Sequence, residues 1–237
     1  MPAPQATASS ATPVPPTATT ADPVPTSTRR IHPTGQATAE DYAWVGDSGL
    51  TEVYSLTWLR HLSPSAVVER IGGRVLGTYP WQDPWYDLPG LGRHEDGVVV
   101  TRISGWTLML TSLGPEDATI RQLSRGGRLV GLTYNFEADS RFVLADNGAI
   151  QVDFDPGYAV SRTGKHPDLL LPDMRKAGLD LSGVYLNPAD PAYRYIPSTE
   201  AAHALTERVT GVARTAGTRP SRYAARPASM ASSCSPA

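Results

Sequence analysis

Residues 141–154 read RFVLADNGAIQVDF, two short apolar stretches joined by Asp-Asn-Gly. This tripeptide is typical of tight hairpin turns, because Asn and Gly tolerate the positive φ angles that a two-residue turn requires. In the second stretch Ile150, Val152 and Phe154 alternate with polar residues. Such alternation is typical of a strand with one buried face and one wetter face. The segment therefore predicts an antiparallel hairpin at the C-terminal end of a sheet.

Three further strands are predicted upstream, over residues 98–103, 106–111 and 128–134. Ser104-Gly105 joins the first two as a second hairpin signal. With the strands of the 141–154 hairpin, these predict an antiparallel β-meander of about five strands.

Helical patterns flank the predicted strands. Tyr54, Trp58 and Leu62 recur at every fourth residue and predict a helix over 51–62. Capping signals and apolar stripes predict the others, which begin after Thr38 and extend over 64–71, 116–124, 169–177 and 198–209. We therefore expect an α+β fold, in which N-terminal and C-terminal helices shield one side of the β-meander.

Composition divides the chain of 237 residues into three parts. Residues 1–36 are rich in Pro, Ala and Thr and show no hydrophobic period, so a disordered leader is expected there. Residues 215–237 are again rich in Ala, Ser, Pro and Arg, and are expected to be a mobile tail. A single α+β domain should therefore occupy residues 37–214.

The cysteine content and the hydropathy of the sequence indicate the cellular compartment in which the protein is expected. The one cysteine, Cys234, excludes an intramolecular disulfide and a site built on several thiolates. The N-terminus lacks the apolar core of a secretory signal, and no apolar run is long enough to span a bilayer. We therefore expect a cytoplasmic protein that does not contact a membrane.

The charge is unevenly distributed along the chain. Residues 41–207 hold 14 basic and 21 acidic side chains, a net charge of −7, within a chain whose net charge is −2. An acidic domain makes nucleic acid an unlikely partner. Five arginines from Arg208 to the C-terminus leave open a second possibility, in which the tail binds nucleic acid or an acidic partner.

The sequence contains few motifs that indicate catalysis or cofactor binding. Phosphate-binding, dinucleotide-binding and zinc-protease motifs are all absent from the sequence, so no cofactor is expected. The stretch Gly46-Asp-Ser-Gly49 is similar to a serine protease segment, but the only preceding histidine, His32, lies in the leader. Asp153 and Asp155 are spaced to share a strand face and a divalent cation, although a polar strand end explains them as well. No metal site is therefore predicted.

The aromatic and proline-rich stretch at residues 77–97 is expected to be an ordered, irregular loop. Trp81, Trp85 and Tyr86 lie among its prolines, and rigid aromatic side chains of this kind dominate protein-binding surfaces. The alternative is that these three rings fold back and cover the core. The loop is the first candidate binding site.

A set of short segments follows in order over about 175 residues: Thr38–Trp44, Tyr54–Arg60, Leu62–Gly72, Gly105-Trp106, Leu123–Gly126, Arg141-Phe142 with its turn, Pro167-Asp168 and Thr199–Gly211. In these segments the ordered region resembles an uncharacterised actinobacterial family, the domain-of-unknown-function family numbered 6461. The resemblance implies that residues 1–36 are an extension, and it carries over no functional residue. Leu113-Gly-Pro115 replaces a longer turn of the family.

Two functions remain after these exclusions. The first is a non-catalytic protein-binding or regulatory module whose partner is a protein. The alternative is an enzyme whose site is assembled on the outer sheet face from residues distant in sequence, namely Arg102, Arg128, Arg141 and Asp153.

Overall fold

The computed structural model describes residues 35–46, 53–79, 97–135, 140–183, 196–213 and 222–226. In chain order its elements are η1 (Ala39–Val45), β1 (Val53–Arg60), α1 (Pro64–Arg70), β2 (Arg74–Tyr79), β3 (Val98–Ile103), β4 (Trp106–Thr111), α2 (Asp117–Leu123), β5 (Arg128–Asn135), β6 (Arg141–Asp146), β7 (Ala149–Phe154), η2 (Pro156–Tyr158), α3 (Leu171–Ala177), α4 (Ser198–Thr210) and β8 (Arg222–Arg226).

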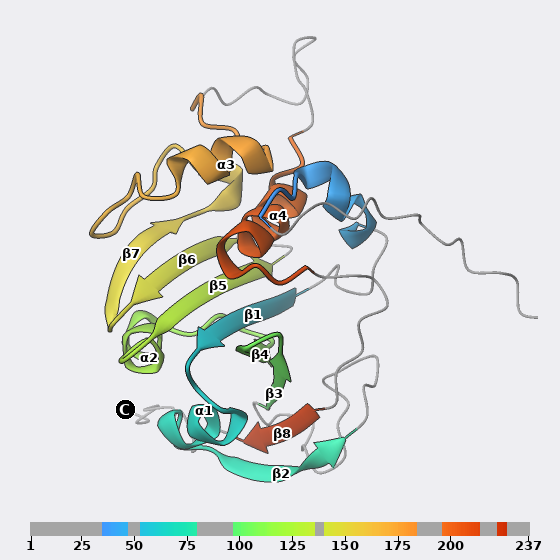
Figure 1. The fold of residues 1–237 in the computed structure, drawn as a ribbon, viewed down its shortest axis with the longest axis vertical. Helices are drawn as coiled ribbons and strands as arrows, with labels where there is room; N and C mark the ends of the chain where they lie inside the picture. Colours follow the sequence, from blue (N-terminus) through green and yellow to red (C-terminus); the bar gives the residue numbers. More distant parts are fainter. Residues whose placement is uncertain are drawn as a thin grey trace, which may run out of the picture.

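One antiparallel sheet organises the described chain, and the α+β class is confirmed. Its eight strands lie in the order β2-β8-β3-β4-β1-β5-β6-β7 (Figure 1). The five predicted strands all form and keep their relative order. They do not make an uninterrupted meander, however, because β1 lies between β4 and β5 and pairs with both.

The prediction of a helix over 51–62 is wrong, because the chain forms strand β1 there. Tyr54 and Trp58 are four residues apart, a spacing that suits a helix face and also a strand face. Leu56 lies between them on the same face of the sheet, while Leu59 packs on the opposite face. A central strand buried on both faces lacks a simple polar alternation, which is why its pattern resembled a helix.

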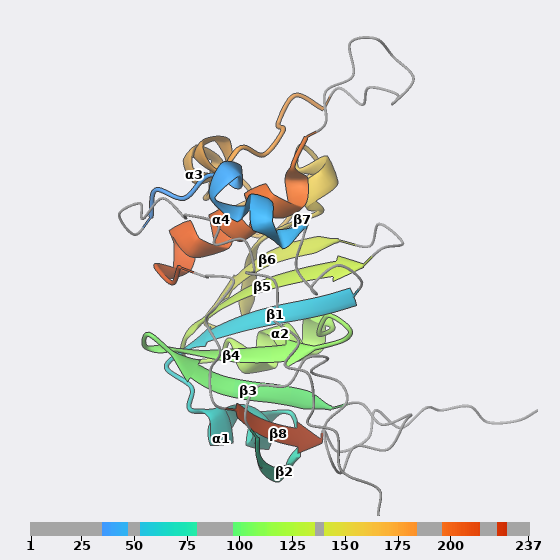
Figure 2. The same ribbon diagram turned by 90° about the vertical axis from the view of Figure 1, so that its right-hand side faces the viewer.

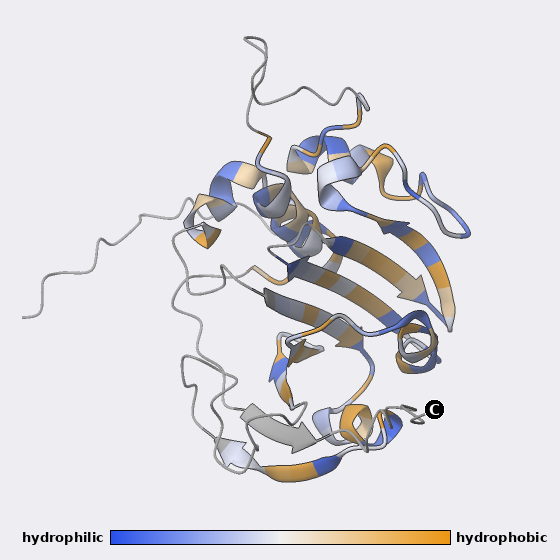
Figure 3. Ribbon diagram, turned by 180° about the vertical axis from the view of Figure 1, so that it is seen from behind, coloured by the Kyte–Doolittle hydropathy of each residue, from blue (hydrophilic) through white to orange (hydrophobic). Residues whose placement is uncertain are grey.

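Helices cover both faces of the sheet, so the expectation that they shield one side is wrong. On one face, here called the α4 face, β1, β6 and β7 pack with η1, α3 and α4 around Trp58 and Phe142. On the other, the α1 face, β3 to β7 pack with α1 and α2 around Met109 and Val143. Apolar residues accordingly extend along the central strands (Figure 3). Only β7, at one edge, keeps the alternating burial that the sequence predicted.

Two strands arise where no regular structure was expected. Residues 74–79 form β2, which takes up the beginning of the predicted irregular loop, while residues 80–96 lie outside the described residues. Residues 222–226 form β8 within the predicted mobile tail. In both views α1 lies beside β2 and β8 at one end of the molecule, and η1, α3 and α4 gather at the other (Figures 1 and 2).

Local signals placed most element ends correctly. Thr38 and Asp41 form the predicted capping box of η1, and Ser63 caps α1 ahead of Pro64. Gly211 ends α4 in the left-handed conformation, with φ of 71°. None of the described helices combines the length and the apolar character that a membrane crossing requires.

Candidate functional site

Most of the predicted aromatic binding loop, residues 80–96, lies outside the described residues. Trp81, Trp85 and Tyr86 are outside the described residues, and so are Asp47 and Ser48 of the protease-like stretch. These expectations therefore stay predictions.

Of the four residues that were predicted to share a site on the sheet face, Arg141 and Asp153 are in contact. Arg141 on β6 donates from Nε and Nη2 to the two carboxylate oxygens of Asp153 on β7, across 2.8 and 2.5 Å. The same Nη2 donates to Oδ1 of Asp117 at the start of α2, across 2.6 Å. The hydrogen bonds that Arg141 donates to Asp153 raise the pKa of its guanidinium above the ordinary value, and Asp117 adds to the effect. With both carboxylates engaged, this cluster ties α2 to the sheet.

The other two residues lie elsewhere. Arg128 on β5 pairs with Asp146 on β6 across 2.9 Å, and its position two residues before Val130 places it on the α4 face. Arg102 on β3 shares the α1 face with Arg141, but β4, β1 and β5 lie between their strands. Four inter-strand spacings amount to roughly 19 Å. The four side chains therefore do not converge on one site.

The Arg102 side chain forms its hydrogen bonds to the described chain through one of its terminal nitrogens. Its Nη1 donates to the carbonyl oxygen of Leu62 across 2.8 Å and to Oγ1 of Thr107 across 3.2 Å. Thr107 donates to the same carbonyl, so β3, β4 and the turn before α1 are joined. No carboxylate of the described residues forms an ion pair with Arg102. Its side chain is exposed.

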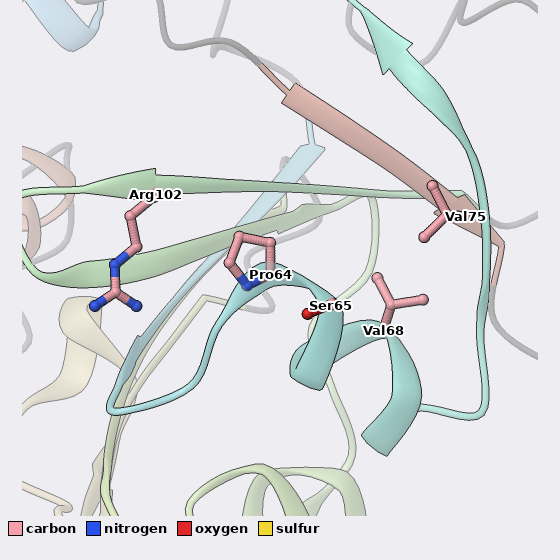
Figure 4. A pocket seen from close by; sticks show the side chains of 5 residues that line it. All are labelled: Pro64, Ser65, Val68, Val75 and Arg102. Carbon is pink, nitrogen blue, oxygen red and sulfur yellow. The ribbon is translucent and has the colours of Figure 1, made fainter.

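A pocket of about 350 Å³ opens beside this guanidinium, on the α1 face. Figure 4 shows its lining side chains, which come from α1, β2 and β3: Pro64, Ser65, Val68, Val75 and Arg102. Ser63 begins α1 at this point, since its Oγ accepts from the Ala66 amide across 3.2 Å. Val75 is 47% exposed. The lining is therefore apolar except for the serine and the cation.

Most of this pocket was missed by the analysis of the sequence. Arg102 was among the predicted residues, and Val68 was predicted as part of a helix stripe. Val75 lies in β2, which directly follows Gly72-Gly73, and the sequence assigned it to no element, because the predicted loop begins at residue 77. The exposure of Val75 at a sheet edge is visible only in the structure.

A buried polar cluster lies under α4 on the opposite face. Tyr54 Oη lies 2.7 Å from Nε2 of His203, and Tyr42 Oη donates to Oε2 of Glu207 across 2.7 Å. The His203 ring stacks between the two tyrosines, with centroid distances of 5.6 and 5.8 Å. His203 and Glu207 are each 1% exposed. This enclosed network fixes α4 and η1 on the sheet.

A cation site is not formed by the described residues. None of them gather as three or more His, Cys, Asp or Glu side chains able to hold a metal ion. The Asp153 carboxylate is bound by Arg141, whereas Asp155 caps η2 by accepting from the Gly157 amide across 2.8 Å. The two carboxylates thus have separate structural partners.

Comparison with known proteins identifies a family. The family described as "Family of unknown function (DUF6461)" matches residues 35–218, which includes every described strand except β8. No curated protein and no solved structure matches the chain. Because the match spans most of the sequence, the chain belongs to DUF6461, a family of unknown function.

Proposed function

We propose that this chain is a non-catalytic protein-binding module, and that the pocket beside Arg102 receives an acidic and apolar segment of a partner protein. One observation carries the proposal: an exposed guanidinium with no carboxylate partner among the described residues borders a pocket whose other lining side chains are apolar except for Ser65. Interfaces are typically built from an apolar centre with charged groups at the rim.

The chemistry of the lining specifies the occupant. Val68 and Val75 offer an apolar surface to an aliphatic or aromatic side chain of the partner. Among the described residues Arg102 donates only from Nη1, and its guanidinium has the planar arrangement of N–H donors that matches a carboxylate. The favoured ligand is therefore an extended segment in which an acidic residue lies next to an apolar one.

The negative charge of the domain favours the binding of acidic segments at this pocket over the rest of the surface. The domain is acidic overall, with a net charge of −7 over residues 41–207, so acidic segments are repelled from most of its surface. The Arg102 guanidinium, which forms no ion pair with a described residue, then provides a local site for them beside the pocket. Residues that repel the wrong partners contribute to specificity as much as the contacts that attract the right one.

The test begins with phage-displayed random 12-residue peptides selected on the immobilised full-length protein. A selected peptide is then synthesised with a fluorescent label, and its affinity is measured by fluorescence polarisation. We expect the selected sequences to place Asp or Glu beside an apolar residue. Arg102→Gln should weaken binding at least tenfold, and Val75→Glu should abolish it by placing a like charge in the pocket.

Matched controls separate binding from folding. Arg175→Gln removes an exposed arginine from α3, on the opposite face, and should leave the affinity unchanged. Val75 is half-exposed, so Val75→Glu should melt within a few degrees of the wild type. If both pocket variants bind the peptide as well as the Arg175→Gln control does, the pocket is not the binding site.

We also infer that the module acts in the cytoplasm of an actinobacterium. The single cysteine supports a reducing compartment, and the resemblance stated above implies the source. Fractionation of cells that express the tagged chain tests the location, because a membrane or secreted fraction holding most of the protein would contradict it.

A further inference from the structure

Strand β8 is inserted between two strands that precede it by more than a hundred residues. Its backbone pairs with β3 through Val98 to Val100, and with β2 along its whole length from Arg222 to Arg226 (Figures 1 and 2). The sheet therefore contains a slot between β2 and β3, and the C-terminal part of the chain fills it.

The slot belongs to the family domain, whereas its occupant does not. The family match ends at residue 218, ahead of β8, and both β2 and β3 lie inside it. Among the described strands, β2 pairs with β8 alone. Without β8, both β2 and β3 would present open backbone edges, and open edges readily accept another strand.

What the structure describes of the attachment of β8 is its backbone pairing. Its sequence, Arg-Tyr-Ala-Ala-Arg, contains two alanines, and alanine has a low preference for strands. Only three residue pairs join it to β3, and an irregularity between Val75 and Gly77 interrupts its pairing with β2. Backbone hydrogen bonds of this kind can be supplied equally well by the same segment of another molecule.

The connection to β8 is long enough for such an exchange. Eleven residues, 211–221, separate the end of α4 from the start of β8. At no more than 3.3–3.6 Å per residue, they reach roughly 36–40 Å. That length exceeds the diameter of a small domain, which is about 30 Å.

We propose that the slot between β2 and β3 accepts β8 from a second copy of this chain, so that two molecules exchange their C-terminal strands. Residues 222–226 of each molecule then occupy the slot of the other, in the register that they adopt within one chain. This exchange uses backbone pairing at the slot and does not depend on the pocket beside Arg102. Each proposal can therefore fail without the other.

The test uses the full chain with the single change Ala224→Pro. Proline lacks the amide hydrogen that the ladder requires and clashes within a strand, so it releases β8 from the slot. The probe is a fluorescein-labelled synthetic peptide of residues 219–230. We expect it to bind the Ala224→Pro chain at least tenfold more tightly than the wild type, whose own β8 competes at high effective concentration.

A second peptide and a mass measurement complete the experiment. The same peptide carrying Ala224→Pro should not bind either chain. After refolding from urea at high protein concentration, light scattering should detect wild-type dimers, and the Ala224→Pro chain should remain monomeric. A folded Ala224→Pro chain that fails to bind the first peptide overturns the proposal, and wild-type protein that stays monomeric excludes a second copy as the occupant.

Hydrogen exchange on the unmodified chain covers the case in which Ala224→Pro does not fold. A separable β8 should open alone, so amides of β8 and β2 should exchange at least a hundredfold faster than those of β1, the central strand. Equal protection in all three strands would mean that β8 opens only when the whole domain unfolds, and that would also overturn the proposal.

Discussion

The hydroxyl of Tyr42 donates a hydrogen bond across 2.7 Å to Oε2 of Glu207, a residue 165 positions later in the chain. The bond joins η1, near the start of the described chain, to the last turns of α4. Both residues are 1% exposed, so water does not replace the bond when it is lost. The contact links the two ends of the family domain.

Tyr42→Phe should therefore destabilise the protein by about 1.5–3 kcal/mol, the range for a hydrogen bond to a charged group. Urea unfolding, followed by tryptophan fluorescence, measures the change. Tyr158→Phe provides the control, because Tyr158 is exposed and should tolerate the loss of its hydroxyl. Equal midpoints for the two variants would show that the Tyr42 bond contributes nothing.

Two adjacent glycines should respond very differently to alanine. A Cβ at Gly127 would lie 2.5 Å from the carbonyl oxygen of Arg60, a backbone atom of the neighbouring strand, whereas a Cβ at Gly126 would meet nothing within 4 Å. Gly126 has a φ of 75°, so Gly126→Ala should cost about 1–2 kcal/mol from the left-handed conformation alone. Gly127→Ala should cost more than that, because β5 must shift away from β1. Thermal melts that rank the two in the opposite order would contradict this packing.

The ion pairs should differ in strength according to their burial. The Asp153 side chain is 20% exposed and receives two bonds from Arg141, whereas Asp168, bound by Arg162, is 68% exposed. Asp153→Asn should cost about 1 kcal/mol, and Asp168→Asn less than about 0.5 kcal/mol. Urea midpoints measured in the same buffer test the difference, and it should shrink in 1 M NaCl.

The start of α1 should depend on its capping residue. Ser63→Ala removes the acceptor for the Ala66 amide and should destabilise the domain by about 1 kcal/mol. Ser63→Asp keeps a side-chain acceptor and should restore most of the loss. If Ser63→Asp melts no higher than Ser63→Ala, the cap does not stabilise α1.

Peptide binding at the pocket should weaken with ionic strength. Arg102 is exposed, so salt screens its attraction to a carboxylate; the Debye length falls from about 10 Å at 0.1 M to about 3 Å at 1 M. Polarisation measurements across this range should record a several-fold loss of affinity. The Arg102→Gln variant should show a much smaller dependence, and an unchanged affinity in the wild type would mean that the apolar contacts alone hold the peptide.

Local features of the sequence predicted local structure well. Asn147 and Gly148 adopt φ of 49° and 80°, as the hairpin turn requires, and Ser104 and Gly105 behave alike. The pairing of Arg141 with Asp153 could also be anticipated, because both belong to that one hairpin. In each case the residues that decide the geometry are close together in the chain.

Local sequence patterns did not predict the order of the strands in the sheet. Arg102 was expected beside Arg141 because the strands were ordered as the sequence runs, whereas β1 separates β4 from β5. Arg128 does lie on the strand next to that of Arg141, but on the opposite face of the sheet. The sequence of β8, Arg-Tyr-Ala-Ala-Arg, carries no hydrophobic period, so its place in the sheet depends on pairing with distant strands. Sequence periodicity reports burial, and it does not report which strand lies next to which.

The central position of β1 also bears on how the molecule folds. Hairpins β3–β4 and β6–β7 close over a few residues and form within microseconds. β1 must instead pair Arg60 with Trp106, 46 positions away, and Val53 with Asn135, 82 positions away. Such distant pairings lose the entropy of large loops before they gain contacts, and they slow folding. We therefore expect the pairing of β1 to be the late, rate-determining step of folding. It joins the part of the sheet that contains the β3–β4 hairpin to the part that contains the β6–β7 hairpin.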